Sequence, residues 1–172
     1  MPILERTIKL ILATVLAIYL AEFLGLAYAT SAGIIAILSL LDTRKSSLKM
    51  AQNRLFSTFL ALAIAWGIFS LIGFEIWTLA LYLLLYVPTA YYFRWEAGIA
   101  PSTVLVTHLL LEKNISLLFL GNEVAIFLIG AGLALVFNLY MPSQEAKIQS
   151  YHHQVKDLLQ LILLRFQDFL LK

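Results

Sequence analysis

Two ionisable side chains stand inside apolar stretches of this sequence, where such groups are rare. Glu22 lies within the apolar run 8–26, and His108 lies within the run 97–111. A carboxylate far from water is costly, so it must face other protein or become protonated, and a functional role is the default expectation. A glutamate and a histidine at similar depth can share a proton. We therefore predict that Glu22 and His108 bind protons or substrate; the alternative is a buried structural pair or two unrelated polar groups.

Hydroxyl side chains gather where two short apolar stretches, 27–41 and 97–111, begin. Pro101 suits the first turn of a helix, so the second of these helices is expected to start near it. The free N–H groups and the positive end of a recessed helix attract anions. We predict a small organic anion between the two helix starts, with simple N-capping as the alternative. The polar lining of this site would come from Ser31, Ser102, Thr103 and Thr107.

The sequence lacks the residues and motifs that common enzymes, metal sites and nucleic-acid-binding proteins need. The absence of cysteine excludes disulfide scaffolds, thiolate metal sites and cysteine nucleophiles. No metalloprotease, serine hydrolase or phosphate-loop motif occurs, and the adjacent His152 and His153 do not make a metal site by spacing alone. The formal net charge of +2 is too small to suggest a nucleic-acid partner. We expect no enzyme activity, no metal and no cofactor.

The elements that must position these residues are membrane-spanning helices. The chain is 62% hydrophobic and 13% charged, with a mean hydropathy of +0.90, which excludes an ordinary soluble domain. A spanning helix needs about 20 apolar residues. The runs 8–26, 55–72, 76–93 and 124–140 meet this need, and 117–122 can extend the last one. These runs predict four full-length spans.

The two shorter stretches, 27–41 and 97–111, would each reach only about 23 Å as helices, so by length they could cross the bilayer or dip into it. If both cross, nearly all the basic residues fall on one side, as the positive-inside rule requires. We therefore predict six spans in a bacterial plasma (inner) membrane, with both termini in the cytoplasm. The basic loop then sets the topology and contacts anionic lipid headgroups through Arg44, Lys45, Lys49 and Arg54.

The first apolar run has a second interpretation as a cleaved signal peptide. Ala27-Tyr28-Ala29 matches the small-x-small pattern of a cleavage site. The run before it is longer than the usual core of a signal peptide and resembles a full anchor. We expect it to be retained as the first span.

The spans follow the same order of lengths twice: long, short, long. Ala32-Gly33-Ile34 opens the first short span and Ala97-Gly98-Ile99 opens the second, while Asn53 and Asn122 precede the third and sixth spans. Three crossings in each half give the halves opposite orientations, and weak symmetry of this kind is typical of transporters. We predict an all-α polytopic membrane protein built from two inverted three-helix halves, residues 1–141.

The chain changes character after Pro142. Ser143 suits a helix N-cap, Glu145 suits the first turn, and apolar residues recur at helical spacing through 155–169. We predict that residues 142–172 form a cytoplasmic amphipathic helix that begins a larger domain. Its apolar face needs a partner: the same helix in a second copy, the rest of that domain, or the membrane surface.

Four separated stretches carry a further signal: 31–39, the basic residues of 43–54, 104–108 (Val-Leu-Val-Thr-His) and 138–143 (Asn-Leu-Tyr-Met-Pro-Ser). Together they resemble the bacterial aromatic acid exporter family, in the fusaric-acid-resistance-like superfamily. The resemblance implies a six-span protein that moves aromatic carboxylates out of the cell, and related plant anion channels imply a homodimer. This chain departs from the family at Ser57, where members usually carry glycine, and it includes only the first helix of their cytoplasmic domain.

These observations together predict an exporter of small organic anions, which are aromatic carboxylates by resemblance, in a lipid bilayer. Proton coupling through Glu22 and His108 is part of this hypothesis. Two alternatives stay open. The chain could be a passive anion channel, or a non-transporting membrane scaffold that recruits a partner through its C-terminal helix.

Overall fold

The computed structural model describes residues 3–40, 47–139, 151, 154–156, 158–160 and 162. All regular secondary structure in this part of the chain is helical, and no strand occurs within it, so the predicted all-α class is confirmed. The chain divides into two units, Met1–Tyr140 and Met141–Lys172. Arg44, Lys45, His152, His153 and the predicted helix start at Ser143 lie outside the described residues.

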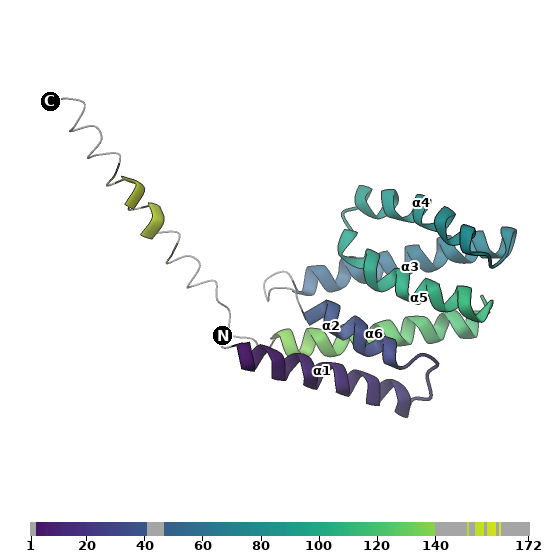
Figure 1. The fold of residues 1–172 in the computed structure, drawn as a ribbon, viewed down its shortest axis with the longest axis horizontal. Coiled ribbons are helices and arrows are strands. Elements are labelled where there is room, and N and C mark those ends of the chain that lie inside the picture. The colour runs from purple at the N-terminus through teal and green to yellow at the C-terminus, as the bar shows by residue number, and fades with distance from the viewer. Residues whose placement is uncertain are drawn as a thin grey trace, which may run out of the picture. The chain divides into compact units, whose positions relative to one another are not determined.

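Six α-helices lie side by side in the first unit, with a single 3₁₀ turn between the fourth and fifth (Figure 1). They are α1 (Ile3–Phe23), α2 (Thr30–Leu40), α3 (Ser47–Ile72), α4 (Ile76–Tyr92), η1 (Glu96–Gly98), α5 (Ile99–Glu112) and α6 (Leu117–Leu139). Asn53 and Asn122 were expected before the third and sixth spans. The structure places them inside α3 and α6, because both helices begin earlier than the apolar runs do.

Among the described residues, two helices are long and apolar enough to cross a bilayer, Leu48–Ile72 and Leu117–Leu139. Thr30–Leu40 and Ile76–Tyr92 are apolar but shorter. The first predicted short span, 27–41, starts later than expected because residues 24–29 form a non-helical connection in which Tyr28 has a positive φ of 58°. The count of six spans therefore stays a prediction.

The six helices pack as two groups of three. α6 packs against α1 and α2, whereas α3 packs against α4 and α5. The third helix of each predicted half therefore lies with the first two helices of the other half. Contacts of α2 with α5 and of α3 with α6 join the two groups.

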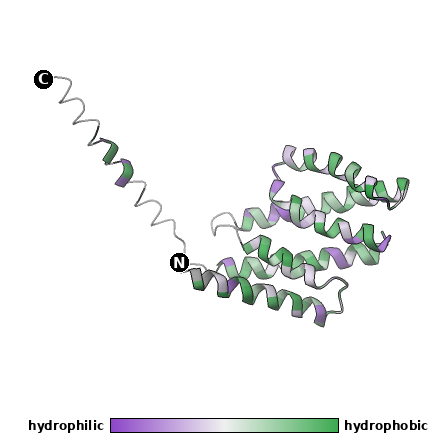
Figure 2. Cartoon of the chain, in the orientation of Figure 1, coloured by the Kyte–Doolittle hydropathy of each residue, from purple (hydrophilic) through white to green (hydrophobic). Residues whose placement is uncertain are grey.

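Small residues at the helix contacts allow the backbones to approach closely, as is usual for helices packed in lipid. Ala17, Ala61 and Ala134 are fully buried. A Cβ added at Gly130 would overlap the carbonyl oxygen of Ala32, so α2 and α6 require glycine at this crossing. Many large apolar side chains are exposed on the bundle, as a lipid-facing surface requires. Figure 2 shows hydrophobic residues along all of its helices.

The second unit is described only at residues 151, 154–156, 158–160 and 162. All of these residues are helical, and all are exposed. Their apolar members include Val155, Leu158, Leu159 and Ile162. This agrees with the predicted helix over these positions; its cytoplasmic location and its partner stay predictions.

Candidate functional site

His108 on α5 is buried and held on three sides. Its Nδ1 lies 2.7 Å from Oε2 of Glu123 on α6, and its Nε2 lies 3.0 Å from the Ser31 hydroxyl on α2. The ring of Tyr28 stacks flat on the imidazole, with centroids 4.3 Å apart and planes 6° apart. Three helices and the α1–α2 connection therefore meet at one imidazole.

Glu123 is fully buried, and both of its carboxylate oxygens have partners. Oε2 faces His108, and Oε1 accepts a hydrogen bond of 3.1 Å from the side-chain amide of Asn122. A buried carboxylate is tolerated when it is paired and hydrogen-bonded in this way. If Nδ1–H of His108 donates to the carboxylate, Nε2 is left to accept from Ser31. An imidazole and a carboxylate in this arrangement can share a proton.

Asn122 also fastens the α1–α2 connection to α6. Its amide nitrogen donates to the Ala27 carbonyl at 3.2 Å, and its side-chain oxygen accepts from the Ala27 N–H at 2.9 Å. The Tyr28 hydroxyl donates to Oε1 of Glu112, at the end of α5, at 2.6 Å. The connection is thus bonded to both neighbouring helices beside His108. We call Tyr28, Ser31, His108, Glu112, Asn122 and Glu123 the His108 network.

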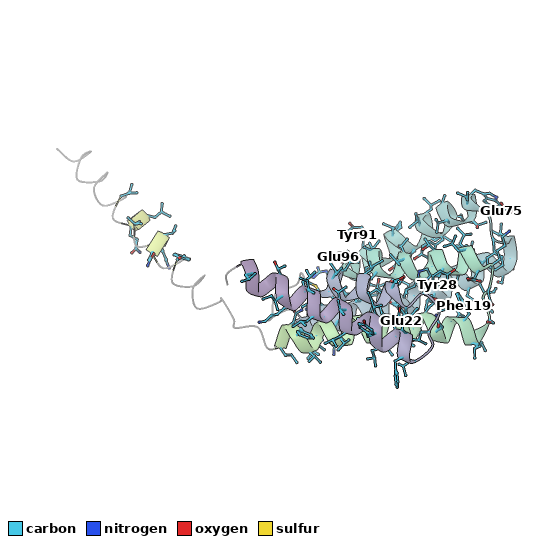
Figure 3. All side chains as sticks on the ribbon, turned by 60° about the horizontal axis from the view of Figure 1, so that its bottom comes forward. Glu22, Tyr28, Glu75, Tyr91, Glu96 and Phe119 are labelled. Carbon is cyan, nitrogen blue, oxygen red and sulfur yellow. The ribbon has the colours of Figure 1, made fainter. Side chains whose placement is uncertain are left out.

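Of the two predicted ionisable residues, only His108 lies in the bundle interior. Glu22 is exposed, one residue before α1 ends (Figure 3), and the carboxylate beside His108 is Glu123 instead. The buried face of α1 carries Ala13, Ala17 and Ala21. A residue one position after Ala21 is turned away from that face, because successive side chains are about 100° apart around a helix.

Glu123 was missed by the sequence reasoning, although the signal for it was present. The expected apolar runs 117–122 and 124–140 stop and restart on either side of it. The rule that singled out Glu22, an ionisable group inside an apolar helix, applies equally to Glu123. Applied there, it would have identified the carboxylate that pairs with His108.

Arg54 on α3 is buried at the opposite end of α2 and α6. Its guanidinium donates to the Ser39 hydroxyl at 2.6 Å and to the Leu38 carbonyl at 3.1 Å. Asn138 near the end of α6 donates to the Ser39 carbonyl at 3.1 Å. We call Leu38, Ser39, Arg54 and Asn138 the Arg54 network. This placement differs from the expected contact of Arg54 with lipid headgroups, whereas Lys49 is exposed, as that role requires.

The predicted polar lining does not gather at one place. Ser31 belongs to the His108 network, whereas Ser102 lies 3.0 Å from the Thr58 hydroxyl on α3. The hydroxyls of Thr103 and Thr107 donate to carbonyls of their own helix, at Ile99 and Val104. Side chains of Thr and Ser that bond back to their own helix need no ligand. Within the described residues, no group of three His, Cys, Asp or Glu residues could hold a metal ion.

The sequence model of the aromatic acid exporter family, member 1, matches residues 1–141. The chain belongs to the aromatic acid exporter family. It is therefore a membrane protein from a family of transporters, and both polar networks lie within the matched residues.

The chain is also similar to a curated protein from Bacillus subtilis (strain 168), "Uncharacterized protein YqjA". The two are 37% identical over 166 residues, which cover 96% of this chain and 52% of the relative. The chain thus spans about half the length of the curated relative that it matches. No solved structure matches it.

Proposed function

We propose that the chain exports small aromatic carboxylates and couples their movement to protons at His108 and Glu123. The observation that carries this proposal is the fully buried carboxylate of Glu123, 2.7 Å from His108 inside a bundle of apolar helices. Paired ionisable groups at such depth are typical of proton relays in transporters. The family supplies the substrate class, since its members are aromatic acid exporters.

The pair has the bonds that a reversible proton site needs. With one proton shared between His108 and Glu123, the pair carries a negative charge; a second proton makes it neutral overall. That added proton has to go to Nε2, so the Ser31 hydroxyl must turn from donating to accepting. The change in charge also acts on the neighbouring side chains. Tyr28 stacks on the imidazole and bonds Glu112, and Asn122 bonds Glu123. Protonation therefore alters the bonds that hold the α1–α2 connection to α5 and α6.

The proposed topology has six spans in a bacterial plasma membrane, with cytoplasmic termini and two inverted three-helix halves. It is supported by the placement of basic residues, which the positive-inside rule puts at the cytoplasmic ends of the helices. In this topology the Arg54 network lies at the inner end and the His108 network at the outer end. A second copy of the chain completes a homodimer, as the family resemblance implies.

The remaining candidate residues have different parts in this proposal. Ser31 acts with His108, and Ser102 supports the α3–α5 contact through Thr58. Glu22 is exposed near the outer end, where it can exchange protons with water before they reach Glu123. Thr103 and Thr107 line α5 without a direct part in proton transfer.

The test is uphill movement of benzoate in proteoliposomes that contain the full chain. The membrane potential is clamped at zero, a pH gradient is imposed, and protein-free vesicles measure leakage of the neutral acid. We expect benzoate to accumulate on the acidic side, opposite to the proton flow, and Glu123→Gln and His108→Asn to abolish this accumulation. Matched replacement of the exposed Glu75 by Gln should leave it unchanged.

Two results point to the other functions. A passive anion channel would move benzoate down its gradient at a rate that the pH gradient does not alter. An interior-negative potential alone can drive an anion outward, at about 2.3 kcal/mol per charge per 100 mV. A scaffold would move no benzoate in either direction while still inserting in the membrane and assembling.

A further inference from the structure

The connections before the two short helices have the same backbone geometry. Three hydrogen bonds of the same kinds end α1 and α4, and in each set the middle residue is left-handed, Gly25 at φ 68° and Arg94 at φ 60°. A shift of 69 positions, from 25 to 94, relates the two turns. The two connections can therefore be compared position by position. The bonded pairs are Leu24–Leu20, Gly25–Glu22 and Leu26–Ala21 in the first half, and Phe93–Thr89, Arg94–Tyr91 and Trp95–Ala90 in the second.

An asparagine fastens each connection, and the same shift of 69 positions relates Asn53 to Asn122. The side chain of Asn53 donates to the Arg94 carbonyl at 3.3 Å, and that of Asn122 donates to the Ala27 carbonyl at 3.2 Å. Each asparagine thus bonds the connection that belongs to the other half. Lys49 is exposed four residues before Asn53 on α3, and residues four apart lie on the same side of a helix. Lys49 therefore lies one helical turn from the residue that bonds Arg94.

Arg94 occupies a backbone position that favours glycine. An arginine at φ 60° is strained because its Cβ crowds the backbone, whereas glycine adopts this conformation freely. Gly25 forms the same turn in the first half, so the turn itself requires no side chain at this position. The Arg94 side chain is exposed, and its guanidinium makes no hydrogen bond or ion pair with the described residues. The second connection thus presents a positive charge at the surface of the bundle, at a cost in backbone strain.

Aromatic rings surround this turn. The Trp95 ring stacks on Phe93 with centroids 4.8 Å apart, and on Phe56 of α3 with centroids 5.5 Å apart. Tyr92 meets Phe93 edge to face at 5.1 Å and is 82% exposed, and Phe56 and Phe93 are exposed as well. The rings therefore form one continuous cluster beside Arg94. We call Lys49, Phe56, Tyr92, Phe93, Arg94 and Trp95 the Arg94 patch.

The equivalent end of the first half has a different surface. The positions that the shift of 69 relates to the Arg94 patch carry no charge and one aromatic ring: Leu118, Ala125, Phe23, Leu24, Gly25 and Leu26. Glu22, which is exposed at that end, corresponds to Tyr91 (Figure 3). Because the turn is the same in both halves, the turn does not explain the cations and stacked rings of the second one. The difference indicates different surroundings at the two ends.

We propose that the Arg94 patch binds the headgroup of an anionic phospholipid. An arginine fork pairs with a phosphate through two parallel, charge-assisted hydrogen bonds, and Lys49 adds a second cation. The patch lies where α4 ends, beside the first turns of α3 (Figure 1). In the proposed topology this is the inner end, so the lipid belongs to the cytoplasmic leaflet. The inference uses the proposed function only to choose this leaflet.

The aromatic rings and the small net charge both favour a lipid. Trp and Tyr side chains are enriched at the depth of the headgroups, because each combines an apolar ring with a polar group. Trp95 and Tyr92 therefore hold Arg94 at the depth where the lipid phosphates lie. Glu96 is exposed two residues after Arg94, so Lys49, Arg94 and Glu96 together carry a net charge of +1. A single net charge favours a lipid, which is already concentrated in the membrane beside the patch, over an anion dissolved in water.

The experiment measures the thermal unfolding midpoint of the purified full chain in neutral detergent with added phosphatidylglycerol. Phosphatidylcholine, which has no net charge, is the control lipid, and phosphatidylglycerol should raise the wild-type midpoint more. Arg94→Gln should increase the phosphatidylglycerol concentration that gives half of this effect about fivefold, as expected for one cation near a lipid surface. Arg94→Lys should keep most of the wild-type response, because the charge is kept. Glu96→Gln should lower the half-effective concentration.

Replacement by glycine separates lipid binding from folding. Arg94→Gly removes the backbone strain together with the charge, so the midpoint without lipid should not fall, whereas the lipid response should weaken as in Arg94→Gln. Lys113→Gly is the matched control. Lys113 is also exposed and has a φ of 50°, but it lies at the far end of α5, next to Glu112. Its replacement should leave the lipid response unchanged.

The inference is overturned if the two lipids stabilise the wild type equally, or if Arg94→Gln keeps the wild-type lipid response. A soluble anion at the patch would also overturn it. In that case inorganic phosphate or benzoate would raise the wild-type midpoint without lipid, and Arg94→Gln would remove this effect. None of these measurements involves transport. An absence of benzoate export therefore refutes the proposed function alone, and an unchanged lipid response in Arg94→Gln refutes this inference alone.

Discussion

The His108 network and the Arg54 network lie at opposite ends of the same bundle and contain different kinds of ionisable side chain. The first pairs a buried carboxylate with an imidazole. Tyr28, from the α1–α2 connection, stacks on that imidazole and donates a hydrogen bond to Glu112 on α5. In the second, a buried guanidinium donates to two neutral oxygens at the end of α2. One end can therefore change its charge by binding a proton, whereas the other keeps a positive charge, because arginine does not lose its proton in proteins. The comparison therefore separates an end whose charge one proton can change from an end whose charge is fixed.

The largest expected effect is the loss of one partner from the charged pair. Glu123→Ala leaves His108 buried without its carboxylate, and breaking a buried pair in this way costs about 3–5 kcal/mol. The thermal unfolding midpoint in detergent should fall sharply. Adding His108→Ala should cost less than the sum of the two single changes, since the unpaired group is then gone. A fully additive double variant would show that the two side chains do not interact.

The next effect compares two glycines at the starts of the short helices. A Cβ at Gly98 would overlap the Ser57 Cβ and approach the Arg54 backbone, whereas at Gly33 it meets only side-chain atoms, of Ile18 and Thr14. Gly98→Ala should therefore destabilise by about 1–3 kcal/mol, and Gly33→Ala by less, since the Ile18 side chain can rotate away. Unfolding midpoints of the two variants test this order. Gly132→Ala is the control, since nothing lies within 4 Å of an added Cβ there.

A smaller effect distinguishes the two asparagines. Asn122 makes two hydrogen bonds with Ala27 and one with Glu123, whereas Asn53 makes one bond of 3.3 Å. Asn122→Ala should cost about 1–3 kcal/mol because it removes three hydrogen bonds, one of them to the buried Glu123, and Asn53→Ala about 0.5–1.5 kcal/mol. Faster hydrogen exchange at residues 24–29 should accompany the first change only. Equal effects from both would contradict the greater dependence of the α1–α2 connection on its asparagine.

The smallest effect is expected at Glu22. Because its side chain is exposed, Glu22→Gln should change stability by less than about 0.5 kcal/mol. It should slow proton-driven benzoate movement far less than Glu123→Gln does. Parallel transport assays of the two variants decide which carboxylate serves His108. A larger loss in Glu22→Gln would reverse the assignment made from the geometry.

The sequence predicts the helices well and the rotation of their side chains poorly. Long apolar runs predict α3 and α6 because composition and length are properties of the chain itself. The position of Glu22 along the first apolar run can also be predicted from the sequence. The side of the helix on which its side chain lies depends on Ala21 being the residue that packs against the bundle. Arg54 looks like a surface cation in a basic stretch; its burial goes with the close packing of α3 against η1 and α5, which Ser57 and Gly98 permit.

Long-range partners could be predicted only in part. Ser31 and His108 are both singled out by type and position, but their contact spans 77 residues and requires the left-handed turns at Gly25 and Tyr28. The repeated Asn53 and Asn122 are visible in the sequence as well. Their exchanged bonding to the opposite half depends on which helices pack together, and spacing along the chain does not specify that.

The most direct test of proton coupling records the lumenal pH of proteoliposomes with a trapped dye while a benzoate gradient is applied at zero membrane potential. Entry of benzoate through the wild-type chain should acidify the external medium and make the lumen alkaline, which is opposite to the lumenal acidification that leakage of the neutral acid causes in protein-free vesicles. Glu123→Gln should abolish this proton movement. If benzoate crosses through the wild-type chain with no lumenal pH change, or if Glu123→Gln moves protons as the wild type does, His108 and Glu123 are not the coupling site.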